Sequence, residues 1–285
     1  MTGTEQTAAQ LAAVLGAIGL LAYASSSAFY VAFLYGPRPA VGRLATSLAA
    51  VGAVLNLGAL YARAAALHSV PYRDLLGSMK LFGFFLATLS LVLELRHSDR
   101  SLGAFLMPVA LVFNLLALAK SAGSKPPAPE LKGSVFALHV TLNMLSYSAF
   151  AVACALSLLY LTVGRSLKRP DRGLTGPASR LPTLGYLERA NRTSLGVGVL
   201  ALGLGMSFGA YWALKVWTGE HPLWALDPKV LAALVTLAFY AVVLVRAHRG
   251  ASPVSTARLS VLGFLLVLFS YTAVNLLASR LHVFT

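Results

Sequence analysis

All three tryptophans of the 285-residue chain lie in one short segment, W-A-L-K-V-W-T-G-E-H-P-L-W-A-L-D-P-K, which runs from Trp212 to Lys229. Indole rings can cover a flat macrocycle. Two histidines, His139 and His282, lie in other apolar stretches of the chain. Two neutral imidazoles on opposite helices can supply both axial ligands of a haem iron. The residue types therefore suggest haem chemistry, provided that the fold brings them together.

Each of these residues also has an ordinary structural explanation. Tryptophans are common anchors at membrane interfaces. His139 could be a hydrogen-bonded packing residue, and His282 an exposed residue near the end of the chain. Asp227 stands just before Pro228, which is the pattern of a helix N-cap followed by proline at the first helical position. These alternatives stay open at the level of sequence.

The composition is that of a membrane protein. The chain is 58% hydrophobic and 11% charged, whereas soluble domains are about 25% charged. A membrane-spanning helix needs about 20 mainly apolar residues. Runs of this kind predict an all-α polytopic protein, a single integral membrane domain over residues 1–285, with eight spans at about 9–35, 42–67, 74–94, 102–119, 134–164, 193–216, 228–246 and 257–281. The start, M-T-G-T-E-Q-T-A-A-Q, lacks the basic region of a signal peptide, so we expect no cleaved segment.

The distribution of basic residues predicts the orientation of these spans. The net charge of +14 lies between the apolar runs, which favours a lipid bilayer over nucleic acid as the partner. Fourteen lysines and arginines fall in the odd-numbered breaks and eight on the opposite side. We therefore expect a cytoplasmic basic loop at 165–192, an external tryptophan-rich loop at 217–227, and both termini outside. His139 and His282 then lie at the same outer face.

The remaining candidates are weaker. Lys215, Lys229 and Arg280 could meet haem propionates at the outer face. His68 and His221 could add contacts there, whereas His97 and His248 lie in the predicted cytoplasmic breaks. Lys80 is a charge well inside a span. The single cysteine, Cys154, has no partner for a C-x-x-C pair and is expected to be a packing residue.

Several motifs resemble one known family. The segment G-A-Y-W-A-L-K-V-W-T-G-E-H-P-L-W-A-L-D-P-K resembles the tryptophan-rich "WWD" segment of the cytochrome c assembly family of CcsA/ResC type. L-P-T-L-G-Y-L-E-R-A-N-R-T-S is similar to the family's lead-in to that segment. L-H-V-T-L-N-M-L-S-Y and S-Y-T-A-V-N-L-L-A-S-R-L-H resemble its two external-histidine helices. The likeness is good over residues 135–285 and looser in the first half, where P-Y-R-D-L-L-G-S-M is the nearest match.

The resemblance implies a function and a set of site residues. The protein would present haem b at the outer face of a bacterial inner membrane, or its equivalent, for attachment to apocytochrome c. It would work with a CcsB/ResB-type membrane protein, as a haem chaperone or as one half of a haem-attachment synthase, with no catalytic side chain of its own. The implied axial ligands are His139 and His282, and the implied haem surround is Trp212, Trp217, Trp224 and Asp227.

Departures from the family pattern favour an alternative. Leu226 replaces a tryptophan beside the aspartate, and Val230 replaces the glutamate after D-P-K. The gap between the second and third tryptophans is longer than usual. The family's membrane-embedded histidine falls on Val245, with His248 one turn further on. These changes suit a HemX-like accessory or regulatory protein of haem metabolism. A small-solute transporter is a third possibility, for which Lys80 is the main support.

Overall fold

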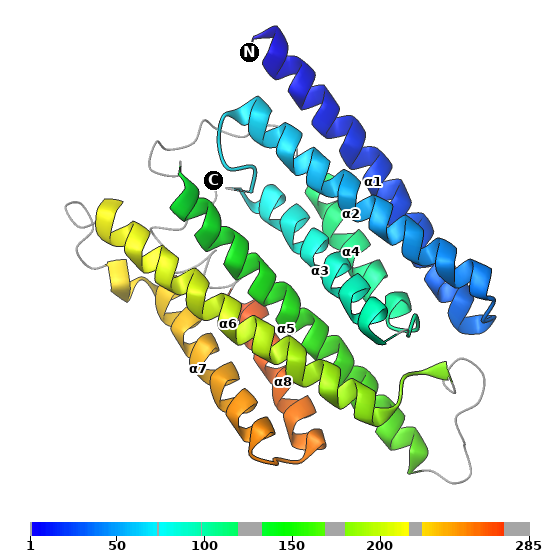
Figure 1. The fold of residues 1–285 in the computed structure, drawn as a ribbon. Coiled ribbons are helices and arrows are strands. Elements are labelled where there is room, and N and C mark those ends of the chain that lie inside the picture. Colours follow the sequence, from blue (N-terminus) through cyan, green and yellow to red (C-terminus); the bar gives the residue numbers. More distant parts are fainter. Residues whose placement is uncertain are drawn as a thin grey trace. The chain divides into compact units, whose positions relative to one another are not determined.

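The computed structural model describes residues 2–72, 74–97, 99–118, 133–168, 180–216 and 224–270. Within these ranges every regular element is helical (Figure 1). The elements are α1 (Gly3–Tyr35), α2 (Pro39–Leu67), α3 (Leu75–His97), α4 (Gly103–Leu118), α5 (Ser134–Leu167), α6 (Leu184–Val216), the 3-10 turn η4 (Trp224–Leu226), α7 (Pro228–His248) and α8 (Pro253–Phe269).

The lengths of the helices confirm a polytopic membrane protein. In the described part of the chain, six helices are long and apolar enough to cross a bilayer, namely α1, α2, α3, α5, α6 and α7. The other two predicted spans correspond to the shorter apolar helices α4 and α8. The last predicted span, 257–281, continues beyond the described residues. The orientation of the termini stays a prediction.

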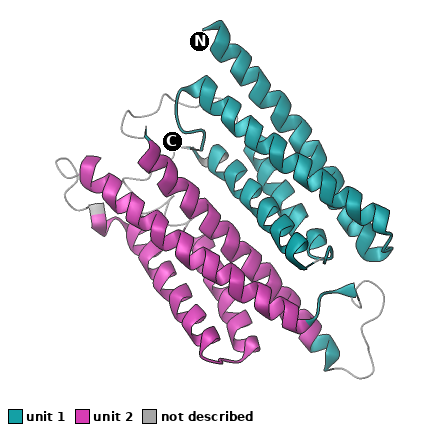
Figure 2. Cartoon of the chain, viewed as in Figure 1, with its two compact units in different colours: residues 1–133, 165–183 teal, residues 134–164, 184–285 magenta. Residues whose placement is uncertain are grey.

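The chain divides into two compact units (Figure 2). A single integral membrane domain over residues 1–285 stays a prediction. Unit 1 contains residues 1–133 and 165–183, and unit 2 contains residues 134–164 and 184–285. Most of the residues suggested by the tryptophan and histidine pattern belong to unit 2.

Unit 1 is held together by small residues and by one buried carboxylate. A Cβ on Gly52 of α2 would lie 2.6 Å from the ring of Tyr23 in α1, so the two helices pack closely there. Glu94 of α3 is buried and accepts hydrogen bonds from the hydroxyls of Tyr30 and Thr46. Arg100 lies 3.2 Å from the same carboxylate. The negative charge of Glu94 is therefore compensated, as a buried charge requires.

Unit 2 is centred on an aromatic pair. Phe150 of α5 and Tyr240 of α7 stack with their ring centroids 3.7 Å apart and their planes 5° from parallel. A Cβ on Gly198 of α6 would lie 2.3 Å from the Phe150 ring, so glycine provides the space for it. The Tyr240 hydroxyl donates to the carbonyl of Ser260 in α8. Helices α5 to α8 thus share one core, in which α6 packs against Phe150 of α5.

The limits of α6 correct the predicted basic loop. We expected a loop at 165–192, but α5 continues to Leu167 and α6 already begins at Leu184. Glu188 and Arg192 pair across one helical turn at 2.8 Å, a contact that stabilises a helix outside the hydrocarbon core. The 33 residues of α6 extend about 50 Å, more than the roughly 30 Å of that core. A helix of this length exceeds the core unless it tilts, and its charged first turns are the part least suited to hydrocarbon.

Candidate functional site

His139 lies in the second turn of α5 and is oriented by α6. Its Nδ1 atom lies 2.8 Å from the carbonyl oxygen of Gly205. A carbonyl can only accept, so Nδ1 must carry the proton and donate it. In the neutral imidazole, the lone pair that could bind a metal is then on Nε2. The helix pair therefore fixes both the tautomer of the ring and its direction.

Asn143, one turn further along α5, is a polar side chain beside this ring. Its Nδ2 atom lies 3.2 Å from Nδ1 and 3.4 Å from Nε2 of His139. Because Nδ1 already carries a proton, the Asn143 amide can donate only to Nε2. Its own Oδ1 is buried and has no hydrogen-bond partner among the described residues. An unpaired buried oxygen of this kind costs about 1–3 kcal/mol, and it marks a position where a donor would be stabilised.

Two glycines of α6 make room for these side chains. A Cβ on Gly209 would lie 2.4 Å from Nδ1 of His139, and a Cβ on Gly205 would lie 2.8 Å from Oδ1 of Asn143. A larger residue at either position would force these side chains to move. Residue type alone did not point to Gly205, Gly209 or Asn143. The available signal was the G-x-x-x-G spacing, which lets membrane helices approach closely.

Trp212 packs in the seam between α5 and α6. Its ring centroid lies 5.4 Å from that of Phe136, and the planes are tilted by 46°. The residue is only 9% exposed. It stands one turn beyond Gly209, the residue of α6 next to the His139 ring. A buried ring fits helix packing better than a role as an exposed interfacial anchor.

Asp227 is the N-cap of α7, as its sequence context predicted. Its carboxylate accepts a hydrogen bond from the Lys229 amide at 2.9 Å, and Pro228 opens the helix. The residue is buried. At the end of α6, the Lys215 ammonium lies 4.5 Å from the centroid of the Tyr211 ring. The N-cap fixes the point where the tryptophan-rich segment enters α7.

Part of the predicted site falls outside the described residues. This applies to Trp217, His221, Arg280 and His282, and to the side chain of Trp224, whose backbone begins η4. The structure therefore brings His139 and Trp212 together on α5 and α6, with Asp227 at the start of α7. The approach of His282 to His139 stays a prediction.

The other candidates have separate surroundings. His68 of unit 1 lies 3.2 Å from Glu5. Lys80 reaches towards α1, where its Nζ lies 2.7 Å from the position of a Cβ on Gly16. Cys154 is a free thiol within α5. The described residues contain no group of three or more histidine, cysteine or acidic side chains that could hold a metal ion.

Comparison with known proteins decides the family. A model of the cytochrome c assembly protein family matches residues 72–282, which is most of the chain. The chain belongs to the cytochrome c assembly protein family. The match includes α5, α6 and α7, the three elements that position the candidate site.

Individual relatives agree with this assignment. The chain is 28% identical to a cytochrome c biogenesis protein CcsA of Gloeobacter violaceus, over 96% of this chain and 97% of the relative. It is 28% identical to CcsA of Trieres chinensis, over 74% of this chain and 77% of the relative. CcsA of Guillardia theta is 29% identical over 74% and 75%. These members of the cytochrome c assembly family support a role for this membrane protein in cytochrome c biogenesis.

Proposed function

We propose that this cytochrome c assembly family member binds haem b where α5 and α6 pack at His139, and presents it for attachment to apocytochrome c. The observation that carries the proposal is the orientation of His139. Its Nδ1 proton is given to the Gly205 carbonyl, so Nε2 is the ring atom left with a lone pair. A histidine that binds a metal usually donates its other nitrogen in this way, which fixes the ring and raises its basicity.

The surrounding residues fit a haem ligand. The Asn143 amide, 3.4 Å from Nε2, would turn away when iron occupies that position, and its unpaired Oδ1 shows that its present bonding is incomplete. Bound haem would supply the iron and the vinyl groups, while the protein supplies ligand and orientation. We assign the second axial position to His282. Trp217 and Trp224 would cover the macrocycle. Trp212 would hold the end of α6 and Asp227 the start of α7, the two helices that the tryptophan-rich segment connects.

The proposed site faces the external side. The positive-inside distribution puts the end of α6, the tryptophan-rich loop and both termini outside a bacterial inner membrane. Thioether formation needs haem close to the thiols of the apocytochrome. We therefore propose a CcsB/ResB-type partner with an external domain that holds the apocytochrome, with this chain as haem chaperone or as one half of the synthase.

A HemX-like accessory or regulatory role is the second candidate. It is favoured by Leu226, Val230 and Val245, which stand where the CcsA/ResC pattern has tryptophan, glutamate and a membrane-embedded histidine. Both candidates share the His139 site. They differ in whether haem bound there reaches an apocytochrome, and co-expression with a CcsB-type protein and an apocytochrome reporter separates them.

The visible spectrum of the purified protein with added haem tests the proposed site. We expect six-coordinate low-spin haem in the wild type. His139→Ala should lose that spectrum, and added imidazole should restore it by filling the vacated position. His248→Ala, at the other end of unit 2's helices, is the control and should bind haem like the wild type. A His139→Ala protein with the wild-type spectrum would remove the basis of the proposal.

A further inference from the structure

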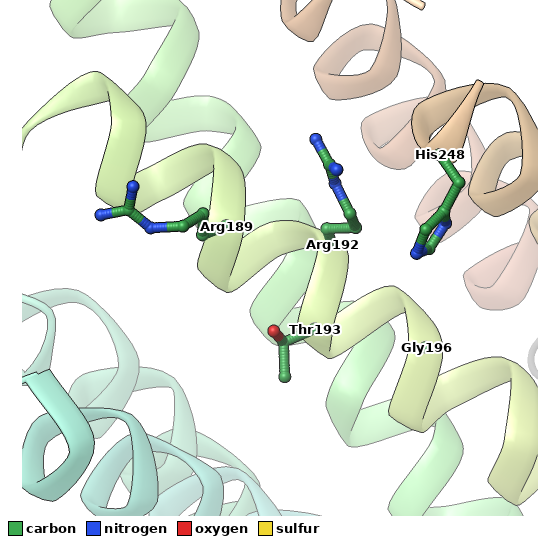
Figure 3. Close-up of a pocket in the computed structure, with 5 residues that line it drawn as sticks. All are labelled: Arg189, Arg192, Thr193, Gly196 and His248. Atoms are coloured by element: carbon green, nitrogen blue, oxygen red, sulfur yellow. The ribbon is translucent and has the colours of Figure 1, made fainter. Parts of the chain in front are cut away.

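A second polar site lies at the opposite end of α6 from His139. A pocket of about 400 Å³ is lined by Arg189, Arg192, Thr193 and Gly196 of α6 and by His248 of α7. Figure 3 shows the His248 ring directed towards the stretch of α6 that carries Arg192, with Arg189 extending from the helix on the other side. All five residues belong to unit 2, and none is part of the proposed haem site.

The nitrogen groups around this pocket have unused hydrogen-bonding capacity. Arg192 gives one nitrogen to Glu188 at 2.8 Å, but its Nε is buried and has no hydrogen-bond partner among the described residues. His248 donates from Nδ1 to the carbonyl of Leu244 at 2.9 Å, which leaves Nε2 with a lone pair that can accept a hydrogen bond. The Arg192 side chain as a whole is 37% exposed, and a planar guanidinium matches phosphate oxygens in particular.

An exposed apolar surface continues directly from the pocket along α6. Leu200 and Leu204 follow Gly196 at helical spacing and are 66% and 45% exposed. On α7, Val245 stands one turn before His248 and is 47% exposed. The basic pocket therefore lies where the charged ends of α6 and α7 meet their lipid-facing apolar sections. A headgroup in the pocket would have its acyl chains beside these side chains.

We propose that this pocket binds the phosphate of an anionic phospholipid. Basic pockets between membrane helices on the cytoplasmic side are suited to such headgroups, and the positive-inside distribution puts this end of α6 in the cytoplasmic leaflet. The guanidinium of Arg192 meets the phosphate, and Nε2 of His248 accepts from a headgroup hydroxyl such as those of phosphatidylglycerol. Arg189 adds a second positive charge to the lining, and the apolar surface separates a lipid from free phosphate. The proposal is independent of haem binding at His139.

Gly196 offers a substitution that fills the pocket without disturbing the fold. A Cβ at this position would meet no described atom within 4 Å, so a side chain can start here without moving its neighbours. Gly203 lies two turns further along the same face of α6 and is equally open among the described residues. Gly203→Phe is therefore a matched control that adds the same ring outside the pocket.

The experiment compares bound lipid by native mass spectrometry, after purification in detergent with equal amounts of phosphatidylglycerol and phosphatidylcholine. Wild type and Gly203→Phe should retain phosphatidylglycerol in preference. The double variant Arg189→Gln, Arg192→Gln should reduce that preference roughly thirtyfold, since each of the two basic residues near a membrane surface adds about 1 kcal/mol. Gly196→Phe should reduce the preference as well, because the ring occupies the space of the headgroup. Wild-type haem spectra for all four proteins would show that they are folded, and melting curves in the same detergent serve this purpose if haem does not bind.

Three results would overturn the proposal. Equal retention of the two lipids by the wild type would show that the pocket does not select a negative headgroup. Displacement of phosphatidylglycerol by millimolar inorganic phosphate would make free phosphate the ligand. Displacement by haem, together with loss of haem from Arg189→Gln, Arg192→Gln, would assign the pocket to the haem carboxylates. If the double variant does not fold, the comparison of Gly196→Phe with Gly203→Phe decides alone.

Discussion

Two faces of α6 use the same residue type in opposite ways. Near the C-terminal end, the space beside Gly205 and Gly209 is filled by Asn143 and His139 of the neighbouring helix. Near the N-terminal end, the space beside Gly196 is open among the described residues. Where a neighbouring side chain fills the position of the missing Cβ, the glycine allows close packing of that side chain. Where nothing fills it, the glycine leaves room for a molecule that is not part of the chain.

The electrical character of the two ends differs in the same sense. At the His139 end, the imidazole proton already has a carbonyl acceptor. At the Arg192 end, one N–H of the guanidinium is buried without an acceptor among the described residues. The His139 ring is thus oriented without a ligand, although Asn143 Oδ1 beside it also lacks a partner among the described residues. At the Arg192 end, the proposed lipid would supply the missing negative charge.

The largest expected effect concerns which side of the membrane each end faces. In a protein in which Cys154 is replaced by alanine, a cysteine at Gly219 should react with an impermeant thiol reagent added from outside. A cysteine at Gly173 should react only after the membrane is opened, because the basic breaks are expected in the cytoplasm. The measurement is all-or-none labelling in intact cells. The reverse pattern would put the haem site and the lipid site in the wrong compartments.

A smaller effect is expected when alanine replaces the glycines of the two ends. Gly209→Ala puts a methyl group 2.4 Å from His139 Nδ1, and overpacking of this kind typically costs about 1–3 kcal/mol. Gly196→Ala enters open space and should be neutral or stabilising, by up to about 1 kcal/mol from helix propensity. Reversible unfolding in mixed micelles measures both. If Gly209→Ala and Gly196→Ala lower the free energy of unfolding equally, the difference in their surroundings does not affect stability.

The smallest effect concerns Asp227. Its carboxylate caps α7 through the Lys229 amide, so Asp227→Ala should lower the free energy of unfolding by about 1 kcal/mol. Asparagine is also a good N-cap, and Asp227→Asn should keep both stability and haem retention. The measurements are unfolding in micelles and haem content after gel filtration. A stable Asp227→Asn protein that loses haem would mean that the negative charge itself acts on the ligand.

Much of the framework could be predicted from the sequence, because the signals involved are local. Apolar runs of sufficient length identified the helices, and Asp227 followed by Pro228 identified the start of α7. The N-terminal limit of α6 was wrong because charged residues were taken as the end of a helix. Glu188 and Arg192 instead stabilise an extra stretch of helix by pairing with each other.

The parts that could not be predicted depend on which helices are neighbours. Asn143 and Gly205 meet across 62 positions of chain, and Arg192 and His248 line one pocket although 56 positions separate them. No periodicity within a single segment indicates such pairs. His139 was found because a histidine in an apolar run is conspicuous by its type, whereas the acceptor that orients it is a backbone atom, which every residue possesses.

That acceptor has a consequence for how the protein can change over time. The oxygen that receives the His139 proton belongs to the main chain of Gly205, and a carbonyl oxygen has two lone pairs, so it can serve a side chain and the helix together. No substitution deletes this atom. Mutation can remove the histidine, or force the helices apart with a bulkier neighbour, but it cannot exchange the acceptor for a different group. The hydrogen bond that directs the imidazole is therefore lost only when His139 is replaced or when the packing of α5 against α6 changes.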